Sequence, residues 1–154
     1  MKRHRYPFRL TVLISLYLCM ASLAIAGTDA TRDFGAHVIL CKAMPSNELD
    51  SYVALQFNII RAKNRGVLNI AVMEKSEDGA IGRSVLGKIT ALWSDLNGRM
   101  GSIPMREFQR QNAIYYIGEF DFVGGATMTF NILVSVDENR PPYSFSVKKQ
   151  FPAE

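Results

Sequence analysis

A basic motif near the middle of the chain holds the side chains with the clearest chemical potential. The stretch RAKNRGVLNI places Arg61, Lys63 and Arg65 at alternate positions. On an extended chain these three cations would line one side, where their mutual repulsion requires an anionic neighbour. A carboxylate could fill that role, because the planar guanidinium group of arginine matches its shape. The anion could belong to a ligand or to the protein itself.

Two asparagines belong to the same motif. Asn64 precedes Arg65-Gly66, and both Asn and Gly tolerate the positive φ angles of tight turns. Asn69 falls within an apolar run, where its amide must find hydrogen-bonding partners. The preferred interpretation is a polar staple that holds the crossing at residues 57–65 to a sheet, and a ligand site is the alternative.

A pair of carboxylates offers a second kind of chemistry. Glu119 and Asp121 would lie on one face of a strand, with their Cα atoms roughly 6–7 Å apart. Glycoside hydrolysis uses carboxyl pairs at comparable separations, so a small hydrolase is one alternative. Phe120 and Phe122 would point to the opposite face. The preferred interpretation is therefore that the two carboxylates lie on a solvated face of the strand and the two phenylalanines on its core face. The two carboxylates are also candidate internal partners for the basic motif.

Adjacent tyrosines present one ring to each face of the same predicted strand. One of Tyr115 and Tyr116 is therefore expected in the core. The other could stack on a sugar or a peptide, although cross-strand packing is the more common role of such a ring.

The single cysteine and histidine beyond the N-terminal leader give no catalytic set. On a strand, Cys41 and His37 would stand about 13 Å apart, too far for a dyad. Apolar neighbours predict that Cys41 is buried, and one thiol cannot form an internal disulfide. One Cys and one His also fall short of the three or four ligands of a zinc site. We therefore expect no metal site and no cofactor.

The leader itself predicts export. Four basic residues within the first nine positions precede an apolar run that ends in Ala24-Ile25-Ala26. This order is typical of a secretory signal peptide, so we expect cleavage after Ala26 and one periplasmic domain over residues 27–154. An uncleaved anchor is the alternative, but the run is shorter than the roughly 20 residues of a membrane span.

Removing the leader changes the charge of the protein. The whole chain has 18 Lys and Arg against 14 Asp and Glu, a net charge of +4. Residues 1–26 hold four of these bases and no acid, which leaves 14 of each. The mature chain is therefore neutral and has no basic field to attract nucleic acid or an anionic membrane.

Period-two alternation through most of the mature chain predicts seven or eight strands in an antiparallel, immunoglobulin-like β-sandwich. A closed β-barrel is the alternative, since it has the same alternation. Asn97-Gly98 is a hairpin signal, and one short helix is expected within residues 45–56, capped by Asn47. The expected strands cover residues 34–42, 67–74, 84–96, 100–110, 113–122, 127–136 and 143–151.

Three stretches together, RAKNRGVLNIAV, LWSDLNG and AIYYIGEFDF, resemble an uncharacterised family of exported bacterial proteins, domain of unknown function 4426. The family pattern of Arg-x-Lys-Asn-Arg, an internal strand Asn, a Leu-x-Gly turn and Tyr-Tyr-Ile corresponds to residues 61–65, 69, 96–98 and 115–117. The family's turn is commonly tighter than Leu-Asn-Gly. The resemblance implies a β-sandwich-like periplasmic domain and brings no activity with it.

The preferred functional interpretation is a non-enzymatic module that binds another envelope protein or a peptide, because the chain is neutral and lacks a catalytic set. The alternatives are a binder of a small ligand or glycan and, third, the hydrolase that uses Glu119 and Asp121. The candidate binding residues are Arg61, Lys63, Asn64, Arg65, Asn69, Tyr115 and Tyr116.

Overall fold

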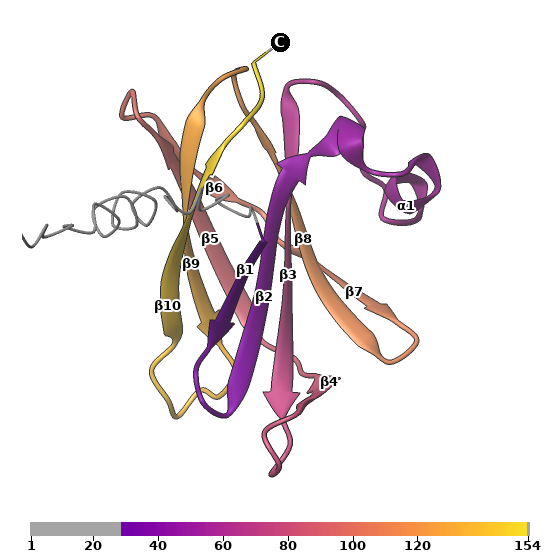
Figure 1. Ribbon diagram of the computed structural model, residues 1–154, viewed down its shortest axis with the longest axis vertical. Helices are drawn as coiled ribbons and strands as arrows, with labels where there is room; N and C mark the ends of the chain where they lie inside the picture. Colours follow the sequence, from indigo (N-terminus) through magenta and orange to yellow (C-terminus); the bar gives the residue numbers. More distant parts are fainter. Residues whose placement is uncertain (1–28, 154) are drawn as a thin grey trace, which may run out of the picture.

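Two antiparallel sheets pack face to face in the computed structural model, which describes residues 29–153 (Figure 1). Sheet A has the order β1-β2-β3-β8-β7, with β4 also paired to β3, and sheet B has the order β10-β9-β5-β6. The predicted antiparallel sandwich is confirmed, and the barrel alternative is wrong because the two sheets stay separate. The leader and its cleavage site lie outside the described residues.

The strands are β1 Asp29–Asp33, β2 His37–Pro45, β3 Arg65–Lys75, β4 Ile81–Ser84, β5 Lys88–Asp95, β6 Met100–Ile103, β7 Arg106–Arg110, β8 Ala113–Asp121, β9 Thr127–Ser135 and β10 Tyr143–Gln150.

The core follows from the alternation of the strands. Leu68, Ile70 and Val72 of β3 point between the sheets and are fully buried, while Val67 and Asn69 face the other way. Period-two burial is what a strand with one face on the core requires. Aromatic rings fill the space against sheet B, and these are Phe120, Phe122, Phe130 and Phe151.

Residues 100–110 are not the single strand that the sequence predicted. β6 pairs with β5 in sheet B, whereas β7 pairs with β8 in sheet A. Pro104 lies between them and has no N–H to donate to a ladder, so the chain leaves one sheet there and enters the other. The short strands β1 and β4 were also not predicted.

A helical excursion leaves the end of β2 and returns at β3. It contains a 3-10 turn, η1 (Ser46–Glu48), and the helix α1 (Ser51–Gln56). Asp50 caps α1, because its carboxylate accepts hydrogen bonds from the backbone N–H groups of Tyr52 at 2.8 Å and Val53 at 3.3 Å. The expectation that Asn47 caps the helix was therefore wrong. A carboxylate at this position also meets the positive end of the helix dipole.

The excursion covers part of the outer face of sheet A. Ala54 and Ile59 pack against Val67 of β3 and Ile117 of β8, and partly buried aromatic rings surround them. This second, smaller cluster gives sheet A apolar contacts on both faces near α1. Within residues 29–153, no helix has the length and apolar character to cross a membrane.

Candidate functional site

The structure divides the basic motif instead of presenting it as one row. Arg61 donates a hydrogen bond from Nη2 to the carbonyl of Asn47 at 2.8 Å, which ties the crossing to η1. Lys63 is exposed in the turn that precedes β3. Arg65 points toward the end of β8, where its Nε lies 3.5 Å from Asp121 Oδ1.

Glu119 of β8 contacts β3, β7 and the crossing that precedes β3. Its Oε1 accepts a hydrogen bond from Arg106 Nη2 at 3.0 Å, and its Oε2 lies 3.6 Å from Arg65 Nη1. The backbone N–H of Ile60 also reaches Oε2, at 3.4 Å. Glu119 and Asp121 are thus internal partners of the motif, as one of the two interpretations of the sequence expected.

Ser46 also holds the crossing in place, a role that the sequence predicts for the basic motif alone. Its side chain is fully buried. The hydroxyl oxygen lies 2.9 Å from the carbonyl of Ile60 and 3.2 Å from that of Ala62, which share its one proton, and it accepts from the N–H of Ala62 at 2.9 Å. A single serine therefore satisfies the backbone of an irregular segment that has no ladder of its own. No pattern in the sequence marks this residue.

A groove of about 680 Å³ lies between the excursion and the outer face of sheet A. We call it the outer groove. Its volume falls within the roughly 300–1,000 Å³ range of ligand pockets. Two of the predicted site residues, Asn69 and Tyr115, line it. The full lining is Lys42, Met44, Leu49, Val53, Gln56, Phe57, Ile59, Val67, Asn69, Arg110, Gln111, Tyr115 and Ile117.

Asn69 is the unusual member of this lining. It sits at the centre of sheet A, opposite Lys42 of β2 and Ile117 of β8. Its Oδ1 is covered and accepts no hydrogen bond from the described residues. Such an atom lowers stability, since an unsatisfied buried polar group costs about 1–3 kcal/mol.

A smaller hollow of about 260 Å³ continues from the outer groove toward β1. The two share Lys42, Asn69 and Tyr115, so Asn69 stands at the junction between them. Leu40, which is 38% exposed, lines the smaller hollow. The charged residues of the two linings are Lys42 and Arg110, and both are cations.

The two tyrosines face opposite sides of β8, as predicted. Tyr115 lies on the outer face, where Phe57 meets it edge to face. Tyr116 is buried in the main core, and its hydroxyl accepts a hydrogen bond from the N–H of Gly87 at 2.8 Å. Burial raises the pKa of Tyr116 above its ordinary value. The position of Tyr116 gives its ring a structural role and no access to a ligand.

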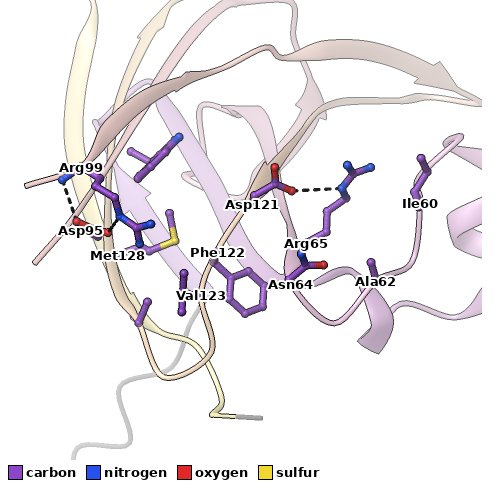
Figure 2. Close-up of a pocket in the computed structure, with 12 residues that line it drawn as sticks. Ile60, Ala62, Asn64, Arg65, Asp95, Arg99, Asp121, Phe122, Val123 and Met128 are labelled. Atoms are coloured by element: carbon purple, nitrogen blue, oxygen red, sulfur yellow. Dashed lines mark hydrogen bonds and ion pairs between the residues drawn. The ribbon is translucent and has the colours of Figure 1, made fainter. Parts of the chain in front are cut away.

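Asn64 and Arg65 line a second cavity, at the end of the sandwich where β5 and β8 finish (Figure 2). Its volume is about 560 Å³, and we call it the end pocket. The backbone carbonyl of Asn64 accepts from the N–H of Phe122 at 2.9 Å, which fixes one wall of this pocket. Asn69 and Tyr115 do not line it, so four of the predicted site residues are divided between two cavities, and Arg61, Lys63 and Tyr116 line neither of them.

His37 and Cys41 do not meet in a crevice. His37 Nδ1 lies 3.0 Å from the hydroxyl of Tyr143, whereas Cys41 is buried in the main core. Among residues 29–153, no group of three or more His, Cys, Asp or Glu side chains is placed to hold a metal ion.

The sequence profile of the domain of unknown function DUF4426 matches residues 31–154. The chain belongs to the DUF4426 family. This DUF4426 domain is similar to the crystal structure of a DUF4426 family protein from Pseudomonas aeruginosa PAO1, with 28% sequence identity and a TM-score of 0.68. That similarity covers 82% of this chain and 98% of the Pseudomonas chain.

More distant structures share the fold of the DUF4426 domain. FetP from uropathogenic Escherichia coli strain F11 is similar in its as-isolated form, with 8% identity and a TM-score of 0.57, over 82% of this chain and 95% of FetP. A copper-bound variant of FetP gives 9% identity and a TM-score of 0.55, over 82% and 97% of the two chains. Identity this low shows the common fold and nothing about ligands. None of the curated proteins matches the chain.

Proposed function

We propose that this DUF4426 domain is a non-enzymatic binding module of the periplasm. Its outer groove would take an apolar peptide segment with an acidic residue, supplied by another envelope protein. The observation that carries the proposal is the covered Oδ1 of Asn69 in the outer groove, which accepts no hydrogen bond from the described residues. A peptide supplies the hydrogen-bond donor that the described residues do not.

The chemistry of the groove favours a peptide in particular. An extended peptide carries a backbone N–H at every residue except proline, and each needs an acceptor when it leaves water. The amide of Asn69 can turn about its soft terminal torsion to present Oδ1 to such a donor. Met44, Val53 and Phe57 offer apolar contacts for the side chains of the peptide.

Charge selects the kind of peptide. Lys42 and Arg110 are cations, and none of the described residues that line the outer groove or the hollow beside it is acidic. Complementary charge steers the encounter and fixes the orientation of a partner. An acidic residue that flanks the apolar segment would therefore be preferred over a basic one.

The periplasmic location is part of the proposal and rests on the N-terminal pattern. Sequencing the N-terminus of the protein recovered from the periplasm tests it, and the expected first residue is Gly27. Recovery of uncleaved protein from the membrane fraction would overturn this assignment.

The hydrolase alternative draws less support from the arrangement of the carboxylates. Glu119 lies against Arg65 and Arg106, and the side chain of Asp121 is 77% exposed at the rim of the end pocket. Both carboxylate oxygens of Glu119 are already engaged, Oε1 by Arg106 Nη2 at 3.0 Å and Oε2 by Arg65 Nη1 at 3.6 Å and the N–H of Ile60 at 3.4 Å. A substrate would have to displace these contacts before the carboxylate could act on it.

A titration followed by NMR tests the groove. The probes are two apolar hexapeptides that differ only in one flanking residue, Glu in the first and Lys in the second. We expect the acidic peptide to shift the side-chain amide of Asn69 and the backbone signals of Tyr115 and Arg110, and the basic twin to bind more weakly. Equal binding of both peptides, or shifts confined to sheet B, would reject the proposed site.

A further inference from the structure

The end pocket carries a second inference, independent of the outer groove. It opens where the last inward-facing residues of β5, the turn after β8 and the crossing before β3 meet (Figure 2). Its polar lining residues are Asn64, Arg65, Asp95, Arg99 and Asp121. Trp93, Phe122 and Met128 supply apolar walls. No pattern in the sequence marks Trp93, Asp95 or Arg99 as members of a pocket.

One of the two ion pairs in this pocket is tight. Asp95 has a side chain that is only 2% exposed, and its Oδ2 accepts from Arg99 Nε at 2.6 Å. Its Oδ1 accepts from the N–H groups of Asn97 and Arg99 at 2.9 and 3.0 Å. The carboxylate of Asp95 is thus fully used in holding the hairpin turn, and it fixes Arg99 on one wall of the pocket.

The other ion pair of the pocket, between Arg65 and Asp121, is loose, and so is the neighbouring contact of Arg65 with Glu119. Arg65 Nε and Asp121 Oδ1 are 3.5 Å apart, and Arg65 Nη1 and Glu119 Oε2 are 3.6 Å apart. Charge-assisted hydrogen bonds are usually about 2.7–2.9 Å long, so neither contact uses the donors of Arg65 well. The arginine side chain is 32% exposed and that of Asp121 is 77% exposed. Donors and acceptors therefore stand side by side at the mouth of the pocket.

The balance of charge indicates which ligand would fit. Two arginines and two aspartates line the pocket, and their formal charges cancel. A hydroxyl group donates one hydrogen bond and accepts others, so it can bridge Asp121 and Arg65 without displacing either. A charged ligand would have to compete with one member of a pair.

The apolar walls complete the match. Trp93 lies over Gly101 of β6, where a Cβ atom would stand 2.7 Å from the indole Nε1, so the absence of a side chain at Gly101 leaves room for the ring. A tryptophan side chain combines a large apolar surface with a polar N–H. A ligand with an apolar ring face and a rim of hydroxyl groups, which is the chemistry of a saccharide, meets both kinds of wall.

We propose that the end pocket binds a neutral saccharide, with Arg65 and Asp121 bridging its hydroxyl groups and Trp93 packed against its ring. The volume of about 560 Å³ is large enough for a small ligand of this class. The sugar could be free in solution or the exposed end of a glycan strand. The chemistry at the pocket is the same for both sources.

Fluorescence of Trp93 reports directly on occupancy, because it is the only tryptophan of the chain. The full exported protein is titrated with glucose, N-acetylglucosamine, their disaccharides and, as a charged twin, glucuronic acid. We expect a saturable change with at least one neutral sugar and weaker binding of glucuronic acid. Sedimentation with purified cell-wall glycan distinguishes the sources, since co-sedimentation that free sugar fails to displace would indicate the polymer.

A matched pair of variants isolates the pocket. Asp121→Ala should weaken saccharide binding by roughly tenfold or more, because it removes a charged hydrogen-bonding partner. Asp137→Ala is the control, since Asp137 forms an equally loose pair with Arg140, with Nε 3.5 Å from Oδ2. It should bind like the unmodified protein. No saturable change with any of the neutral sugars, or equal losses in the two variants, would overturn the proposal.

Discussion

Replacing Asn69 by leucine should stabilise the protein while it removes the proposed peptide binding. Leucine has the same branched shape as asparagine, and Val67, Tyr115 and Ile117 surround the position with apolar contacts. The covered Oδ1 has no partner among the described residues, and such a group costs about 1–3 kcal/mol. We therefore expect Asn69→Leu to raise the free energy of unfolding by roughly 1 kcal/mol or more.

Urea unfolding followed by the fluorescence of Trp93 measures this change, as a higher midpoint with an unchanged slope. Asn131→Leu is the matched control. Asn131 occupies a central strand of sheet B, and its Oδ1 already accepts a hydrogen bond from Ser146 at 2.7 Å. It should bring no comparable gain in stability. A loss of about 1 kcal/mol or more in Asn69→Leu would show that the amide holds the sheet together, and the reasoning would fail.

Three further predictions concern the elements that position the two sites. Ser46→Ala should lower the free energy of unfolding by about 1–3 kcal/mol, because it leaves partly buried backbone groups of Ile60 and Ala62 without their side-chain partner, and urea unfolding would contradict this if the midpoint did not change. Gly118→Ala should cost about 1–3 kcal/mol by overpacking, since a Cβ there would overlap the buried side chain of Ile103 and also the sulfur of Met105; an unchanged melting temperature would refute it. Burial acts to raise the pKa of Asp95, but hydrogen bonds from Arg99 and the turn outweigh it and hold the pKa below 3.8. The native state then binds fewer protons than the unfolded state near that pH, so stability should fall as pH drops below about 4, and Asp95→Asn should show a shallower acid dependence in unfolding experiments.

The parts of the fold that could be predicted depend on local pattern. The period-two alternation that predicts the strand at residues 67–74 also sets its faces, with Asn69 on one side and Leu68 and Ile70 on the other. The Asn97-Gly98 turn is also confirmed, with Gly98 at a φ of 79°. Both features are set by residues close together in the chain, so a sequence shows them directly.

The parts that could not be predicted depend on distant contacts. Ser46 reaches carbonyls 14 and 16 residues further along, and nothing near it in the sequence indicates that reach. The sequence around Trp93 does not distinguish it from a core residue. The cavity beside it forms only because the end of β8 and the turn at Arg99 come together in the fold. Pro104 was visible, but one proline does not reveal that the strands on its two sides belong to different sheets.

A paired photocrosslinking measurement in living cells tests the outer groove most directly. A photoreactive residue replaces Leu40, which is 38% exposed beside the groove, or Leu133, which is 40% exposed on the outer face of sheet B. The proposal predicts an adduct with an envelope protein from position 40 that Asn69→Leu and the acidic hexapeptide both abolish, and no such adduct from position 133. Equal adducts from the two positions, or an adduct at position 40 that neither treatment changes, would contradict it.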